Sequence, residues 1–186
     1  MKLNNGDVII FPTDTVYGIG ARIDDLEALE KIYEIKKRPK EKRLAVLCSS
    51  IKDIDDIVYL TDDASKLISH FMPGALTVIL KSKEHVRNDF IFDTVAVRIP
   101  NHELALRILG ENGAMATTSV NISGSKPLND YVDIVREFNN EVLYIYPNTE
   151  IPSKISSTIV DLSGEECVLI REGSIKFSEI LKILNK

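Results

Sequence analysis

The sequence has little of what metal centres and disulfide scaffolds depend on. Its 186 residues include two cysteines, three histidines and no tryptophan. Cys48 and Cys167 stand alone in apolar runs, without CxxC or Cys/His spacing, so structural zinc and a redox motif are both disfavoured. We interpret both cysteines as small buried hydrophobic residues.

Long apolar runs are also absent. No segment reaches the roughly 18 apolar residues that a transmembrane helix needs, which argues against membrane association. The N-terminus, MKLNNGDVII, lacks the basic, apolar and small-residue regions of a secretory signal. With 186 residues, of which 44% are hydrophobic, the chain is long enough for one well-buried core. We therefore expect a single cytoplasmic domain over residues 1–186.

Familiar catalytic motifs are missing as well. The chain contains no GxxxxGK[ST], GxSxG or HExxH, and GIGARI fails GxGxxG because Ile23 stands in place of the third glycine. His70, His85 and His102 have no partner at ligand spacing, so we interpret them as surface or capping residues. No serine, threonine or cysteine has an adjacent base that would make it a covalent nucleophile. P-loop and Rossmann sites are excluded.

What the chain does contain is an alternation of strand-like and helix-like segments. The apolar and β-branched runs predict strands at 8–11, 44–48, 75–80, 94–100, 114–118, 142–147, 156–162 and 167–172. Three- and four-residue spacing predicts helices at 24–38, capped by Asp24 or Asp25, and at 61–71, 101–109, 131–138 and 177–184. We expect Asn101 to cap the third helix. The late strands follow one another by short turns, so the pattern predicts an α/β domain with a mixed, twisted sheet and flanking helices.

Polar residues gather where the expected strands end, and loops from several elements converge at such ends. The clusters are Pro12–Gly18, Lys36 with Arg38, Thr117–Gly124, and Ser156–Thr158 with Arg171. Hydroxyls, an amide and cations together suit a ligand rich in phosphate or carboxylate. Each cluster also has a purely structural interpretation, because Thr-Asp-Thr can cap a helix and SVNISG can form an Asx turn.

Charge is unevenly distributed along the chain. The segment KKRPKEKR, residues 36–43, carries six basic residues and one acid, although the whole chain has a net charge of -5. A basic segment of this kind is commonly a solvated surface, and on an acidic protein it can also mark an anion site.

Seven segments together resemble a known family. In order and spacing, PTDTVYGIGA, KKRP, PGALTVIL, TVAVRIPNH, TTSVNISG, SSTIVD and IREGSI resemble the YrdC-like L-threonylcarbamoyladenylate synthases, and the match runs from about Gly6 to Ile175. The resemblance is to the short, single-domain form. It implies a twisted open sheet with a basic concave cavity, and a reaction in which L-threonine, bicarbonate and ATP, with Mg2+, give threonylcarbamoyl-AMP and pyrophosphate. A separate transferase would then use the product for the t6A modification of tRNA.

The resemblance also implies roles for individual residues. Substrate contacts are expected from Thr15, Thr117 and Lys81. Nucleotide contacts are expected from Arg38, Lys42, Thr77, Ser119, Asn121, Ser157 and Arg171. Lys36 and Arg38 would be catalytic, stabilising negative charge in the transition state with Mg2+, and no protein metal ligand is expected. Lys42, Leu47 and Lys81 depart from the residues common in longer members.

Two other functions remain open at this stage. The basic segment could bind the phosphates of tRNA or other structured RNA, although the net charge and the absence of an aromatic stacking platform disfavour this. A paralogue could keep the fold and use a different carbamoyl-adenylate substrate, because substrate choice depends on pocket shape. The segment SVNISGSKPL, with Gly124 and Pro127, is a candidate lid.

Overall fold

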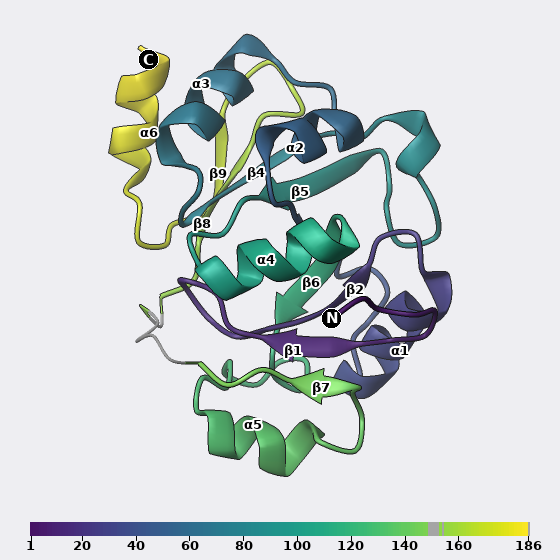
Figure 1. The fold of residues 1–186 in the computed structure, drawn as a ribbon. Helices are drawn as coiled ribbons and strands as arrows, with labels where there is room; N and C mark the ends of the chain where they lie inside the picture. The colour runs from purple at the N-terminus through teal and green to yellow at the C-terminus, as the bar shows by residue number, and fades with distance from the viewer. Residues whose placement is uncertain (149–152, 154, 186) are drawn as a thin grey trace.

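The structure is a computed structural model that describes residues 1–148, 153 and 155–185 (Figure 1). Within these residues nine strands form one sheet, in the order β7-β1-β2-β6-β3-β5-β4-β8-β9. The strands are β1 (Ile9–Phe11), β2 (Gly18–Arg22), β3 (Ala45–Leu47), β4 (Leu76–Lys81), β5 (Thr94–Arg98), β6 (Met115–Ser119), β7 (Tyr144–Ile145), β8 (Thr158–Asp161) and β9 (Val168–Arg171). The helices are α1 (Leu26–Lys36), α2 (Ile51–Ile57), α3 (Asp62–Phe71), α4 (Glu103–Asn112), α5 (Tyr131–Phe138) and α6 (Phe177–Leu184), with a 3-10 turn η1 (Glu84–Val86).

The sheet is mixed, as the sequence predicts. Strands β1 and β7, β3 and β5, and β4 and β8 pair in parallel, whereas the other neighbours are antiparallel. The expected succession of late strands holds for β8 and β9, which are antiparallel neighbours, but it is wrong for β7, which pairs with β1 at the other end of the sheet. Strand-like patterning identifies a strand but not its neighbours.

Some local predictions also needed correction. The GIGAR segment forms β2, although its glycines suggest a turn, and residues 51–57 form α2 behind a capping box in which Ser50 and Asp53 exchange hydrogen bonds. His102, not Asn101, caps α4, because the imidazole accepts from the Ala105 N–H. Cys48 is buried as expected, but Cys167 is partly exposed beside the edge strand β9.

Helices cover one face of the sheet almost completely. Helices α2, α3 and α6 pack on alternate residues of β3, β5, β4 and β8, which include Val46, Val97 and Val78. Helices α1 and α5 pack on the same face of β1, β2 and β6 (Figure 1). The buried apolar residues of these layers form the main hydrophobic core.

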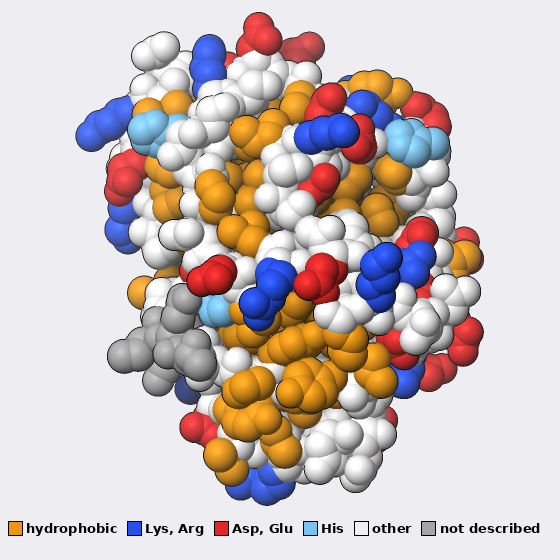
Figure 2. Space-filling model, viewed as in Figure 1, with side chains coloured by type: hydrophobic (Ala, Val, Ile, Leu, Met, Phe, Trp, Pro, Cys, Tyr) orange, Lys and Arg blue, Asp and Glu red, His pale blue; other side chains and the backbone are white. Residues whose placement is uncertain are grey.

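The opposite face is covered only in part. Helix α4 packs there on Ile9, Phe11, Leu47 and Met115, whose neighbours in sequence point into the helical layers. Across the end strand β7, beside β1, apolar side chains gather at the surface (Figure 2), where Leu143 and Tyr144 are about half exposed. In the part of the chain that the structure describes, no helix is long and apolar enough to cross a membrane.

Candidate functional site

A cavity of about 320 Å³ opens on the sheet face that α4 leaves uncovered. Its wall contains seven of the side chains predicted from the sequence: Thr15, Arg38, Thr77, Thr117, Ser119, Ser157 and Arg171. These residues come from the β1–β2 loop, the loop after α1, and strands or strand ends as far along the chain as β9. The prediction that distant hydroxyl and cationic residues line one hollow is therefore confirmed.

Strand register explains why these residues meet. Ser119 pairs with Gly18, Leu47 with Arg98, and Ile159 with both Thr77 and Arg171. Because paired residues on neighbouring strands point to the same face, a row of polar side chains runs across the sheet on the side opposite the main core.

Two glycines of β2 make room for one of these side chains. A Cβ atom on Gly18 would lie 2.6 Å from Cγ2 of Thr117, and one on Gly20 would lie 2.7 Å from its Oγ1. Real Cβ atoms essentially never lie this close to another atom, so the absence of Cβ atoms lets Thr117 lie over β2 without any shift. The glycines thus shape the cavity floor, not a phosphate-binding turn.

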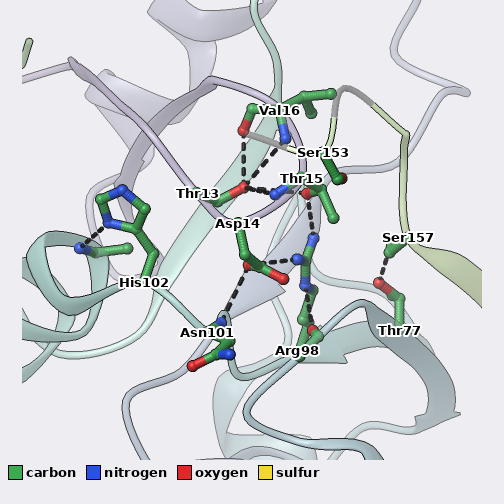
Figure 3. Close-up of polar contacts among 12 residues, drawn as sticks. Thr13, Asp14, Thr15, Val16, Thr77, Arg98, Asn101, His102, Ser153 and Ser157 are labelled. Carbon is green, nitrogen blue, oxygen red and sulfur yellow. Dashed lines mark hydrogen bonds and ion pairs between the residues drawn. The ribbon is translucent and has the colours of Figure 1, made fainter. Parts of the chain in front are cut away.

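The β1–β2 loop is fixed by a buried ion pair (Figure 3). Arg98, at the end of β5, donates to Asp14 Oδ1 at 2.7 Å and to Thr15 Oγ1 at 2.8 Å. Its Nε donates to the Gly74 carbonyl, and Asp14 also accepts from the Asn101 N–H. Burial lowers the pKa of Arg98, an effect that Asp14 opposes. Arg98 lines the cavity, and the sequence reading missed it although it lies in TVAVRIPNH.

A hydroxyl pair lies on another wall of the cavity. Thr77 Oγ1 and Ser157 Oγ are 2.8 Å apart, and Arg171 donates to the Ser157 carbonyl from Nε at 3.1 Å and from Nη2 at 2.9 Å (Figure 3 shows the hydroxyl pair). Burial lowers the pKa of Arg171. The arginine thereby holds the start of β8, and its remaining N–H groups can bind a ligand.

The loop after α1 supplies two more arginines. Arg38 donates to the carbonyls of Lys42 and Arg43 at 2.9 and 2.8 Å, which folds the basic segment back on itself. Arg43 donates to Thr94 Oγ1 at 2.8 Å, and its guanidinium lies 4.7 Å from the centre of the Phe92 ring. Both arginines line the cavity, and Arg43 was not predicted from the sequence.

Four predicted residues do not line the cavity. Lys36 and Asn121 are buried behind it, where the Lys36 ammonium donates to Asn121 and to the Ser119 carbonyl. Lys42 contributes its carbonyl to the loop, and Lys81 is exposed at the far end of β4 from Thr77. Chain position does not distinguish a cation that faces a cavity from one that lies behind its wall.

The cavity is strongly cationic. Arg38, Arg43, Arg98 and Arg171 all contribute to its wall. Of these four arginines, Arg98 alone has a carboxylate within ion-pair distance among the residues that the structure describes. No described group of three His, Cys, Asp or Glu residues could hold a metal ion. Unpaired guanidinium groups beside several hydroxyls are suited to a ligand that carries phosphate or carboxylate groups.

An α/β protein with an arginine-lined cavity on the open face of its sheet has a site suited to small polyanionic ligands. Comparison with known proteins is more specific. Residues 1–173 match the family Sua5/YciO/YrdC, described as "Telomere recombination", and the chain belongs to this family.

Similar proteins include two named threonylcarbamoyl-AMP synthase. The one from Pyrococcus abyssi is 32% identical over 99% of this chain and 55% of its own length, and the one from Bacillus subtilis is 32% identical over 98% and 54%. A crystal structure of P. abyssi Sua5 complexed with L-threonine is 33% identical and has a TM-score of 0.91 over 96% of this chain and 54% of that one. The chain thus spans about half the length of these relatives, and its similarity to their fold confirms the predicted fold class.

Proposed function

We propose that the chain is a threonylcarbamoyl-AMP synthase, which converts L-threonine, bicarbonate and ATP into threonylcarbamoyl-AMP and pyrophosphate. The observation that carries this proposal is the cavity, where hydroxyls and arginines with no carboxylate partner among the described residues converge from six strands and loops. The names of the similar proteins, and the L-threonine bound in one of them, support the choice of substrates.

The proposed reaction has two bond-forming steps. The amine of threonine attacks the carbon of CO2 and loses a proton, or attacks bicarbonate with loss of water, and either route gives a carbamate. A carbamate oxygen then attacks the α-phosphorus of ATP, and the bond to the departing pyrophosphate breaks. Because a carbamate is labile in water, holding both substrates together in one cavity is the main expected contribution, worth roughly 7 to 11 kcal/mol in favourable intramolecular cases.

Negative charge grows on the α-phosphate and on pyrophosphate during the second step. Arg38, Arg43 and Arg171 are the groups placed to stabilise it, because none of them has a carboxylate partner among the described residues. Lys36 is not assigned a direct role here, since its N–H groups are used behind the wall.

Mg2+ is proposed to enter with ATP. Among the described residues, the cavity wall supplies hydroxyls and no carboxylate, and Asp14 lies outside it and is engaged by Arg98. This donor set does not make a protein-held metal site, but it accommodates a metal that the phosphates themselves coordinate. Bound in that way, Mg2+ would neutralise part of the phosphate charge.

The product is proposed to pass to a transferase that modifies tRNA. The alternative of RNA binding through the basic segment receives no further support, because Arg38 and Arg43 from this segment face the cavity.

The test is pyrophosphate release with purified protein, with each substrate omitted in turn and the adenylate identified by mass. We expect release only when L-threonine, bicarbonate, ATP and Mg2+ are all present. Serine and carbamoyl phosphate, offered in place of threonine and bicarbonate, distinguish a paralogue. Release that does not depend on threonine would overturn the proposal.

A further inference from the structure

The loop after β6 is held by a buried cation that has no acidic partner in the described part of the chain. Lys36, the last residue of α1, is 1% exposed, and its ammonium donates to the carbonyl of Ser119, to the carbonyl of Asn121 at 2.6 Å and to Asn121 Oδ1 at 3.1 Å. A lysine ammonium has three N–H groups, so all three are used.

The orientation of the Asn121 amide follows from its neighbours. Its Nδ2 donates to the carbonyls of Ile122 and Ser125 at 2.9 and 2.8 Å, which uses both of its hydrogens. The reverse orientation would turn an NH2 group towards the Lys36 ammonium and leave both carbonyls facing an oxygen. Oδ1 of Asn121 therefore faces Lys36, and it can only accept hydrogen bonds.

This orientation determines what Ser119 offers a ligand. The Ser119 hydroxyl lies 2.8 Å from Asn121 Oδ1, and because that oxygen only accepts, Ser119 is the donor. A serine has one hydroxyl hydrogen, so this bond consumes it. Ser119, which lines the cavity, presents lone pairs there and no hydrogen.

We propose that Lys36 is a positioning residue that acts through Asn121 and makes Ser119 a hydrogen-bond acceptor towards the cavity. The matching ligand group is an N–H or O–H donor, such as a ribose hydroxyl or the exocyclic amine of a nucleotide. Ionised phosphate oxygens are acceptors and do not pair with Ser119. The inference rests on the proposed function, because it assigns Ser119 to the nucleoside part of ATP and not to its phosphates.

Calorimetric titration with two ligands tests the assignment. ATP carries donors and phosphates, whereas magnesium pyrophosphate carries phosphates alone. We expect Ser119→Ala to weaken ATP binding about five- to tenfold, the size of one hydrogen bond, and to leave pyrophosphate binding unchanged. Ser123→Ala makes the same substitution in the same loop, and it should alter neither affinity.

Lys36→Met should weaken ATP binding and leave pyrophosphate binding unchanged, as Ser119→Ala does. The double variant should bind ATP no more weakly than Lys36→Met alone. The 2′-deoxy, 3′-deoxy and deaminated analogues of ATP each lack one hydrogen-bond donor. The analogue that lacks the donor to Ser119 should bind the wild type more weakly than ATP does, and Ser119→Ala should not weaken its binding further. A general structural defect would weaken the binding of ATP and of pyrophosphate alike.

The inference is overturned if Lys36→Met or Ser119→Ala weakens pyrophosphate binding as much as ATP binding. The substituted residue would then contact phosphate or act only on the fold. If Lys36→Met does not fold, Ser119→Ala and its control decide the question. Wild-type protein that binds ATP but never releases pyrophosphate would contradict the proposed function and leave this inference standing.

Discussion

The two faces of the sheet each bury a cation, and they do so differently. On the cavity face, Arg98 has a carboxylate partner, Asp14, at 2.7 Å. On the helical side, the partners of Lys36 among the described residues are neutral oxygens of Ser119 and Asn121. A guanidinium paired with an acid forms a rigid support for the β1–β2 loop, whereas an ammonium without one remains sensitive to pH. The difference shows that a buried charge near a cavity need not serve the ligand directly.

The largest expected effect comes from breaking the acid-paired cation. Arg98→Met leaves the partly buried Asp14 without its partner and removes the donor to Thr15. We expect a loss of about 3–5 kcal/mol in the free energy of unfolding, measured by urea denaturation. Adding Asp14→Asn should restore part of the loss, and an unchanged stability of the single variant would show that the pair is not buried in solution.

The next effect concerns catalysis. Arg38→Ala removes one of the cavity arginines without a carboxylate partner, and turnover should fall about a hundredfold in the pyrophosphate assay. Arg136, on α5, does not line the cavity and pairs with Asp133, so Arg136→Ala serves as the matched control. Near wild-type turnover of Arg38→Ala would remove Arg38 from the proposed mechanism.

The third prediction concerns the cation without an acid. Burial lowers the pKa of Lys36 to about 7 from the ordinary 10.5. Between these values the unfolded chain binds more protons than the folded chain, so stability rises with pH across this window. The cost of burying the ammonium is fully present below pH 7 and is relieved towards pH 10.5.

The difference in unfolding free energy between wild type and Lys36→Met isolates this effect from other titrating groups. It should move in favour of wild type by about 3–4 kcal/mol between pH 7 and pH 10. A difference that stays constant with pH would mean that Lys36 keeps its ordinary pKa.

The smallest effect tests the shape of the cavity floor. Gly18→Ala places a methyl group 2.6 Å from Thr117 Cγ2, and we expect a cost of about 1–2 kcal/mol in thermal unfolding. Thr117→Ser removes Cγ2 and should relieve that cost. It should not rescue Gly20→Ala, whose Cβ would meet Oγ1 and the Ala116 carbonyl. Equal rescue of both would contradict the packing described.

Sequence reasoning found most elements of the fold because apolar periodicity is a local property. It missed β2, since two glycines in five residues are typical of a turn and only the fit of Thr117 explains them. Six of the seven predicted cavity residues lie in polar clusters at strand ends or after the first helix, and Thr77 was predicted only from the family resemblance. Sequence reasoning missed Arg98 and Arg43, and it could not tell that Lys36 lies behind the wall, because these facts depend on register and on which face a side chain takes.

The central claim is that arginines far apart in the chain bind one polyanion together. An NMR titration that follows the arginine Nε–H resonances during addition of ATP tests it most directly. The account predicts that Arg38, Arg43 and Arg171 shift along one binding curve, with a single dissociation constant, while Arg136 does not move. Shifts confined to the loop of residues 38–43, or separate dissociation constants for Arg38 and Arg171, would contradict it.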